Sequence, residues 1–311
     1  MLRIGLCCIF RDQPIKFANA TATAVGRMNR NDAMAKLARL CAANAEALFA
    51  SLQFCAALGI GCFRINSQIL PLKTHPQHGY HLAELPGGEQ IICRFRDCRA
   101  FAQKNALRTC FHPDQFVVLN SNRPEVVSAS IAELEYQAEV AEWVGADVVN
   151  IHGGGAFGDK QKALAAFART LDFLSPRARS RLTLENDDRT YTPADLIPLC
   201  RSAGVPLVYD VHHHRCNRDG KSEEETTAIA LATWQREPMF HVSSPIDGWS
   251  GSATHRHHDY INVDDFPRCW LDLDLTVEVE AKAKELAVFK LKKELEKRLG
   301  PLRPQSPGPK H

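Results

Sequence analysis

The sequence has almost no net charge, because its 311 residues include 38 Lys and Arg against 36 Asp and Glu, a formal charge of +2. A strong overall cationic field is therefore absent, and any contact with DNA has to come from local clusters of Arg and Lys. No apolar run approaches membrane-spanning length, and the apolar stretch in MLRIGLCCIFR is too short for a signal peptide. We expect no membrane partner and no obligate protein partner, and a cytoplasmic location if the source is bacterial.

Paired cysteines and a nucleotide-binding glycine motif are missing as well. The eleven cysteines are odd in number, include no Cys-x-x-Cys spacing and mostly lie in apolar runs, so we interpret them as reduced core thiols. No GxGxxG follows an early strand, which argues against an open dinucleotide-binding sheet.

Short apolar strands alternate with longer amphipathic helices along the chain. Strands are predicted at 3–10, 60–66, 107–112, 147–152, 181–186, 206–211, 239–244 and 275–280. Helices are predicted at 32–58, 91–106, 124–144, 159–174, 193–203 and 223–233, with a last helix that ends at Gly300. Because parallel strands need helical crossovers of this length, we expect one α/β domain, a (β/α)8 TIM barrel at 1–300, followed by a disordered Pro-rich tail at 301–311.

Ionisable residues stand at the ends of these strands. Side chains two apart share a face of a strand, and this alternation allows one face of each strand to be assigned to the barrel interior. The inward residues near the strand ends are His112, His152, Glu185, Asp210, His241, Glu278 and Glu280. Barrel active sites lie at the C-terminal rim, and histidines and carboxylates from separate strands are ligands typical of zinc, manganese or iron. The sequence therefore predicts a metal centre at that rim.

The stretch DVHHHR at 210–215 offers more imidazoles than one site needs. His213 can return to the centre if the chain turns after Val211, whereas His212 and His214 are expected to support the ligands or face solvent. In the similar run at 255–258 we favour His257. Each histidine taken singly could be a hydrogen-bonded structural residue, but burying so many ionisable groups without a cation would be costly.

Six segments in order, FRINSQILPL, HPDQFVVLNS, NIHGGGAFGDK, LTLENDD, DVHHHR and VEAKAKE, resemble motifs of the UV damage endonuclease family. These are DNA repair enzymes with the metal-binding barrel of endonuclease IV, and the resemblance covers about residues 3 to 290. It implies metal ligands at His112, His152, Glu185, Asp210, His213, His241, His257 and Glu280. One ion is expected among His112, His152 and Glu185, a second among Glu185, Asp210, His241 and Glu280, and a third near His213 and His257. Manganese is the expected metal, with zinc as the alternative.

The family cuts damaged double-stranded DNA immediately 5′ to cyclobutane dimers or 6-4 photoproducts and leaves a 3′-hydroxyl and a 5′-phosphate. The resemblance thus implies a metal-dependent endonuclease in which Glu185, Asp210 and Glu280 serve catalysis. Gln115 and Phe116 match residues that enter the duplex opposite the lesion, although Phe116 could instead pack under the rim. Among the arginines considered as phosphate contacts, Arg64 is the favoured one, and Arg256 is another.

Two residues depart from the family pattern. Met239 stands two residues before His241, where the family usually has a lysine, and Glu278 stands two residues before Glu280, where an apolar residue is usual. Because the two strands are neighbours, we hypothesise that Glu278 replaces the negative charge of a modified lysine.

Other functions fit the same barrel. An apurinic/apyrimidinic endonuclease or a metal-dependent sugar isomerase is the alternative among enzymes, although an isomerase favours a carboxylate-dominated site and a lysine, whereas histidine is prominent here. A non-catalytic lesion-binding protein, with Met239 marking lost chemistry, is the alternative from another class.

Overall fold

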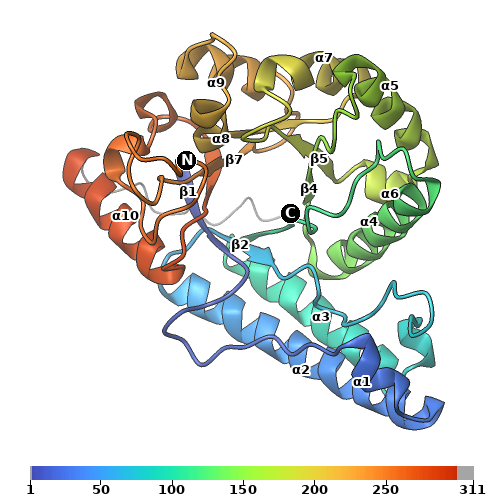
Figure 1. Cartoon of the computed structure of the whole chain (residues 1–311). Coiled ribbons are helices and arrows are strands. Elements are labelled where there is room, and N and C mark those ends of the chain that lie inside the picture. Colours follow the sequence, from blue (N-terminus) through green and yellow to red (C-terminus); the bar gives the residue numbers. More distant parts are fainter. Residues whose placement is uncertain (1, 300–311) are drawn as a thin grey trace.

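In the computed structural model, which describes residues 2–299, eight parallel strands close into a barrel in the order β1 to β8 (Figure 1). The strands are β1 Leu2–Cys7, β2 Cys62–Ile65, β3 Arg108–Phe111, β4 Val148–His152, β5 Leu182–Glu185, β6 Leu207–Asp210, β7 Met239–Val242 and β8 Leu275–Val279. The predicted (β/α)8 barrel is confirmed, and each predicted strand is present with ends that differ by a few residues. The predicted tail at 301–311 lies outside the described residues.

Helices surround the barrel and join its strands (Figure 1). The long ones are α2 Arg30–Ala57, α3 Gly88–Lys104, α4 Pro124–Val144, α5 Lys160–Thr170, α7 Pro193–Ala203, α9 Glu223–Leu231 and α10 Glu285–Leu299. Three short ones, α1 Ala22–Gly26, α6 Pro176–Arg179 and α8 Val211–Cys216, were not predicted. Local sequence explains the ends of α7: Thr192 and Asp195 form a capping box, and Gly204 ends the helix with a φ of +63°.

The barrel interior is apolar below the rim. Cys62, Cys110, Val148, Val208 and Met239 form a buried cluster there together with Trp234. Farther along the strands, the same inward face carries polar side chains, as the alternation of side chains in a strand requires. The barrel thus has an apolar floor beneath a polar rim.

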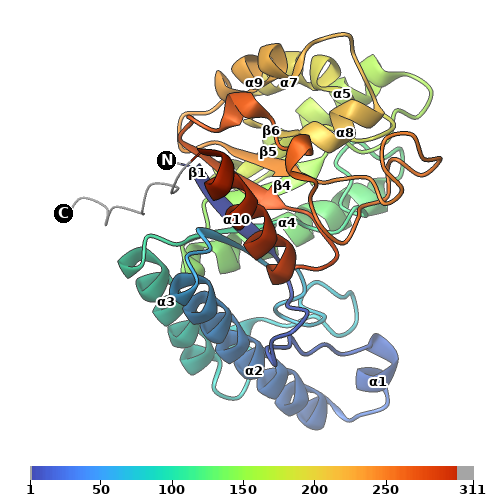
Figure 2. The same cartoon turned by 90° about the vertical axis from the view of Figure 1, so that its left-hand side faces the viewer.

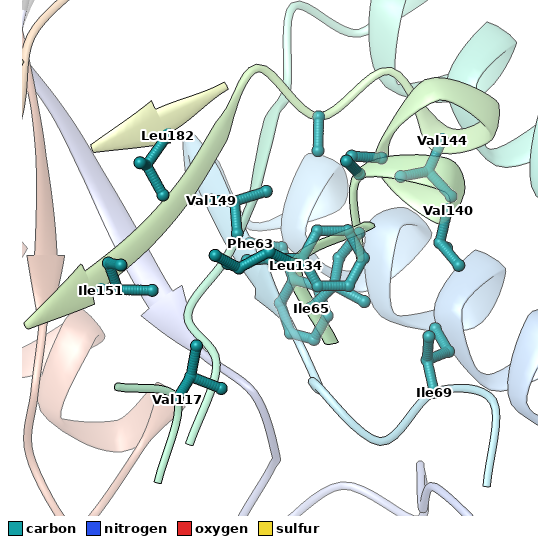
Figure 3. Close-up of a cluster of buried hydrophobic side chains, with 14 of the residues drawn as sticks. Phe63, Ile65, Ile69, Val117, Leu134, Val140, Val144, Val149, Ile151 and Leu182 are labelled. Carbon is teal, nitrogen blue, oxygen red and sulfur yellow. The ribbon is translucent and has the colours of Figure 1, made fainter. Parts of the chain in front are cut away.

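The main core lies between the strands and the helices, and Figure 3 shows part of it. Val149 and Ile151 of β4 and Leu182 of β5 point outward into this core, as predicted for alternate residues. They pack in one buried cluster with Leu134 and Val140 of α4. Outward apolar packing of this kind fixes the strand register and hence the direction of every inward side chain.

Helix α2 lies beside α3 and extends past the barrel (Figures 1 and 2). Among the described residues it is the one helix long and apolar enough to cross a membrane by length and composition. This corrects the expectation that no apolar segment approaches that length. Its side chains Leu37, Cys41, Leu48 and Leu52 are buried in the main core, and core helices of soluble proteins pass the same test.

Candidate metal centre

Six strands bring ionisable side chains to the C-terminal rim. The backbone register places His152 of β4 opposite Glu185 of β5, and Asp210 of β6 opposite His241 of β7. His112 directly follows β3 and Glu280 directly follows β8. Six of the seven inward residues selected from the sequence therefore lie together at the rim, and the seventh, Glu278, lies below them.

Glu185 lies at the centre of the group and is fully buried. The distances to its carboxylate oxygens are 2.9 Å from His112 Nε2, 3.1 Å from His241 Nδ1, 3.4 Å from His213 Nδ1 and 3.9 Å from His152 Nε2. Asn150 Nδ2 also donates a hydrogen bond to Oε2 at 2.5 Å. One carboxylate is thus contacted by side chains of β4, β7 and α8 and by His112, which follows β3, as expected of a bridging ligand.

Charge interactions control protonation in this cluster. Burial alone would raise the pKa of Glu185, but the field of His241, followed by His152 and the hydrogen bonds from His112 and His213, holds its pKa well below the usual range. For His241, burial favours the neutral ring, but the Glu185 charge outweighs it and raises the pKa to about 10. In the absence of a bound cation, the carboxylate is therefore anionic and the His241 ring carries a proton at neutral pH.

Three groups of side chains at the rim have ligand atoms within 4.8 Å of one another. They are His112 with His152 and Glu185, His112 with His241 and Glu280, and Glu185 with Asp210 and His213. The first matches the first predicted ion group. The other two divide the second predicted group differently, because His112 joins His241 and Glu280, whereas His213 joins Asp210.

The residues fit divalent ions by a second criterion. Oδ2 of Asp210 and Nδ1 of His152 are buried and lack a hydrogen-bond partner. An unsatisfied buried polar atom costs about 1–3 kcal/mol, so these atoms indicate a missing partner. Imidazole nitrogens with carboxylate oxygens are donors for manganese, zinc or iron, and the donor set thus fits such ions.

The short helix α8 explains how His213 reaches the cluster. Asp210 caps this helix, because its Oδ1 accepts a hydrogen bond from the His213 backbone N at 2.8 Å. The chain turns directly after β6, and His213 Nδ1 lies 3.5 Å from Asp210 Oδ2. The turn expected after Val211 is present, and His213 lies among the expected ligands.

The other histidines differ from one another. His257 Nδ1 lies 3.8 Å from Glu280 Oε2, at the edge of the cluster, and belongs to none of the three groups. His214 is buried, with its Nδ1 2.8 Å from the hydroxyl of Tyr209 and its Nε2 3.0 Å from Asp219 Oδ1. His212 is also buried, and both of its ring nitrogens lack a hydrogen-bond partner. His212 and His214 were expected either to support the ligands or to face solvent. Both are buried, so the second expectation is wrong for both.

Arg64 lies inside the barrel rather than at its surface. Its side chain is 8% exposed and contacts Glu278 Oε2 through Nη2 at 2.5 Å and Glu280 Oε1 through Nη1 at 2.7 Å. The guanidinium is thus engaged by two carboxylates beneath the cluster. The predicted phosphate contact of Arg64 stays a prediction, and its present partners are acids of the protein itself.

Glu278 lies below the ligands and contacts one of them. Its Oε2 is 3.0 Å from His241 Nε2, and its Oε1 accepts a hydrogen bond from Cys110 Sγ at 3.0 Å. Met239 lies in the apolar floor, as expected from its place one layer below His241. Burial would raise the pKa of Glu278, but the charge of Arg64 and the contact with His241 lower it to about 2. A permanent negative charge therefore lies under His241, and the compensation hypothesis for Glu278 stays a prediction.

Several supporting residues were not predicted from the sequence. Asn186 is fully buried and holds the Asp210 backbone at both its N–H and its carbonyl. Cys62 and Cys110 form a fourth group of possible ligand atoms with Glu278 below the rim. The inward parity of Cys62 and Cys110 could have indicated their place, whereas the Asn186 contacts depend on a loop conformation that no periodicity encodes.

The loop after β3 carries the two residues expected to enter DNA. Gln115 is exposed, and Phe116 is 75% exposed, so the alternative that Phe116 packs under the rim is wrong. Both residues border a cavity of about 780 Å³ between this loop, the segment 67–76 and α4. An exposed aromatic ring on the loop that follows His112 is available to contact a ligand outside the protein.

Comparisons with known proteins agree along nearly the whole chain. A sequence model described as UV-endonuclease UvdE matches residues 2–303. The chain is 32% identical over 302 residues to the UV DNA damage endonuclease of Bacillus velezensis, covering 93% of this chain and 91% of that protein. A UV DNA damage endonuclease of Bacillus cereus is 30% identical over 287 residues, covering 88% of each chain.

Solved structures are similar as well. The crystal structure of SacUVDE superposes with a TM-score of 0.86 and 26% identity, covering 97% of this chain and 100% of that chain. Endonuclease IV from Thermus thermophilus superposes with a TM-score of 0.62 and 16% identity, covering 95% and 99%. The second similarity concerns the fold alone.

Proposed function

The chain belongs to the UV-endonuclease UvdE family, and on this premise we propose that it is a DNA repair endonuclease that hydrolyses the phosphodiester immediately 5′ to a UV photoproduct. Cyclobutane dimers and 6-4 photoproducts in double-stranded DNA are its substrates, and the products carry a 3′-hydroxyl and a 5′-phosphate. The place of action is the bacterial cytoplasm, on the chromosome.

One observation carries the proposal: three ligand groups overlap at the rim of the barrel, the first and second in His112 and the first and third in Glu185. Overlapping groups suit ions held close together, as two-metal hydrolysis of phosphodiesters requires. The metal ligands proposed are His112, His152, Glu185, Asp210, His213, His241, His257 and Glu280, for two or three manganese ions or, alternatively, zinc. His257 is the outermost member of this set, because its Nδ1 lies 3.8 Å from Glu280 Oε2 and its ring centroid lies 6.2 Å from that of His213.

The side chains have distinct duties in this reaction. Divalent ions in such a site polarise a phosphate oxygen and activate water for hydrolysis. Glu185, Asp210 and Glu280 supply the negative charge that draws cations to the rim. Burial would raise the pKa of Glu280, yet Arg64 and then His241 hold it well below the usual range, so this carboxylate is anionic at neutral pH. Asn150 donates to Glu185 and fixes the orientation of its carboxylate.

Recognition of damage is assigned to Gln115 and Phe116. An aromatic side chain can replace base stacking that is lost at a distorted step, and an amide can bond to unpaired base edges. Both side chains are exposed and lie three and four residues after His112 in the chain, which supports this assignment.

The test uses a duplex with a single cyclobutane dimer, a matched duplex with one abasic site and an undamaged duplex. We expect manganese-dependent cutting of the first alone, one phosphodiester 5′ to the dimer, and its loss with a chelator. Cutting only at the abasic site would establish the apurinic endonuclease instead. Binding to the dimer without cutting at any manganese concentration would establish a lesion-binding protein.

A matched pair of variants separates the two parts of the site. Phe116→Ala should lower cutting of the dimer duplex while manganese binding, measured by calorimetry, is unchanged. Phe173→Ala is the control, because Phe173 is 74% exposed and ends the 3-10 helix Leu171–Phe173, which follows α5 in the chain. Equal effects of the two substitutions would contradict the role of Phe116.

A further inference from the structure

We propose that a cavity beside Glu280, lined by Arg256, Lys282 and Lys284, binds a backbone phosphate of the cut DNA strand. This phosphate is a neighbour of the phosphodiester that is hydrolysed. The inference rests on the proposed function and adds a binding site to it. The cavity measures about 440 Å³ and lies where the segments that follow β1 and β8 meet the loop before His257. Its wall includes Glu280 and His257, so it opens directly beside the candidate metal ligands.

Four permanent cations line this cavity, and three of them have no acidic partner among residues 2–299. Neither an ion pair nor a side-chain hydrogen bond is formed by Arg256, Lys282 or Lys284 within that part of the chain. Other arginines near the rim are engaged: Arg64 contacts Glu280 at 2.7 Å, and Arg215 contacts Glu223 at 2.7 Å. Three unpaired cations around one cavity repel each other, and an anion relieves that repulsion.

The remaining groups of the cavity do not neutralise these cations. Glu280 is already paired with Arg64. Burial raises the pKa of Cys8 to about 11, so its thiol is uncharged at neutral pH. Asp259, on the neighbouring segment, lies 3.9 Å from Arg11. The cavity therefore keeps the formal positive charges of Arg256, Lys282 and Lys284 next to an acidic cluster.

Backbone hydrogen bonds hold the walls of the cavity in place. Lys282 N donates to His258 O at 3.1 Å, and Ala283 N donates to Asp259 O at 2.9 Å, which fastens the segment after β8 to the loop. Ile246 N donates to Arg256 O at 2.7 Å. The cations thus project from segments whose backbones are fixed relative to Glu280, and a site with fixed walls is preorganised for its ligand.

The chemistry of DNA identifies the ligand. Each strand carries one phosphate charge per about 3.4 Å of helix axis, so a phosphate placed at the cluster brings its neighbours close to the same rim. Lys and Arg side chains are the usual partners of these oxygens. A phosphate in this cavity would fix the register of the strand, so that one defined phosphodiester meets the carboxylates.

The first experiment measures how salt affects binding of the dimer duplex in the presence of a chelator. The variant carries Arg256→Gln, Lys282→Gln and Lys284→Gln. Because the cavity is proposed to bind one phosphate, the variant should lower the slope of log Kd against log salt by about 1 and bind about tenfold more weakly at 0.15 M salt.

The matched control carries Lys104→Gln, Arg201→Gln and Lys297→Gln. These cations are exposed and lie near the ends of α3, α7 and α10, on the side of the barrel opposite the rim. Both triple variants lose three positive charges. A difference between them in DNA affinity or in salt slope is therefore expected only if the cavity is a local phosphate site. Circular dichroism and thermal unfolding identify any variant that fails to fold. If the cavity variant fails to fold, the single substitution Lys282→Gln, at an exposed side chain, replaces it.

The second experiment locates the phosphate. Phosphates that flank the cut position are replaced one at a time by neutral methylphosphonates. We expect one replacement to weaken binding of the wild-type protein by about tenfold and to leave the cavity variant unaffected, since both changes remove the same interaction.

The outcomes separate the two proposals. If the wild-type protein neither binds nor cuts dimer DNA, the proposed function fails. If the wild-type protein does both while the cavity variant keeps the salt slope of the control, or stays sensitive to every methylphosphonate, the cavity inference alone is overturned.

Discussion

The two ends of the barrel both contain buried or half-buried ionisable groups, but their charges balance differently. At the N-terminal end, Asp147 and Glu237 are matched by Arg3, Arg108 and Arg236. At the C-terminal rim, within residues 2–299, Arg64 is the one permanent cation that pairs with the acids Glu185, Asp210, Glu278 and Glu280, and it contacts the last two. The other partners of the rim acids are histidines, which lose charge when they deprotonate. The N-terminal cluster, in which acids and arginines are paired, stabilises the fold. The C-terminal rim has more acids than permanent cations, so it can bind added cations.

The largest effect is expected from Glu185→Gln, which removes the shared charge of the rim. Manganese-dependent cutting should fall by on the order of 10³-fold, because an interaction central to charge stabilisation is lost. The metal content of the purified protein should fall by at least about one ion. Elemental analysis and a cutting assay measure the two. Full metal content together with normal turnover would remove Glu185 from the centre.

The next effect concerns Glu278→Gln, which removes the charge beneath His241. Substitution of a residue that orients a metal-ligating histidine typically costs about 10–100-fold in metal affinity or activity. We expect a loss of that size in manganese affinity, measured by titration of metal-free protein. Unchanged metal content and turnover would show that the hypothesis of a compensating charge is wrong. Glu285→Gln is not a suitable control, since Glu285 holds the backbone of Arg11 and Asp12; exposed Glu296→Gln serves instead.

A third prediction concerns protons. The neighbouring acids outweigh the effect of burial and raise the pKa of His241 to about 10 and that of His213 well above its usual value. Groups with raised pKa values carry protons at neutral pH, and ligation must displace them. Manganese binding near pH 7 should therefore release protons, and its affinity should fall about tenfold per pH unit for each proton released as the pH is lowered. Calorimetry in buffers of different ionisation enthalpy measures the release, and a value of zero would contradict the protonated state of the rim.

The smallest effect on cutting is expected at the balanced end. Arg108 contacts Asp147 Oδ2 at 2.8 Å and donates to Thr276 Oγ1 at 3.1 Å. Because Asp147 is partly exposed, Arg108→Gln should lower the free energy of unfolding by only about 1–2 kcal/mol and leave cutting of folded protein unchanged. Urea unfolding and a cutting assay check this. A loss of metal affinity in this variant would mean that the two clusters are coupled.

Strand alternation predicted much of this arrangement. Parity alone placed Glu185, Asp210 and His241 on the inner face, because in a closed barrel all inward side chains at the strand ends meet. It also put Met239 below His241 and Val149 outside. These features depend on periodicity, which short β segments express clearly.

Other features lay beyond periodicity. The helix α8 is too short for a 3.6-residue pattern to be seen, and its start depends on the Asp210 cap. Arg64 was expected to face DNA, yet its pairing with Glu278 and Glu280 involves β2 and β8, which are far apart in the sequence. The different grouping of His112 and His213 among the ligands depends on side-chain distances of a few ångströms, which no sequence pattern contains.

Asp210 has one further property. Its Oδ1 holds the first turn of α8 through the His213 N–H, and its Oδ2 alone has no hydrogen-bond partner. The first turn of α8 therefore orients this carboxylate, and Oδ2 is the oxygen that would be offered to a divalent ion. A change that disturbs the start of α8 would thus also disturb the direction in which Asp210 presents that oxygen.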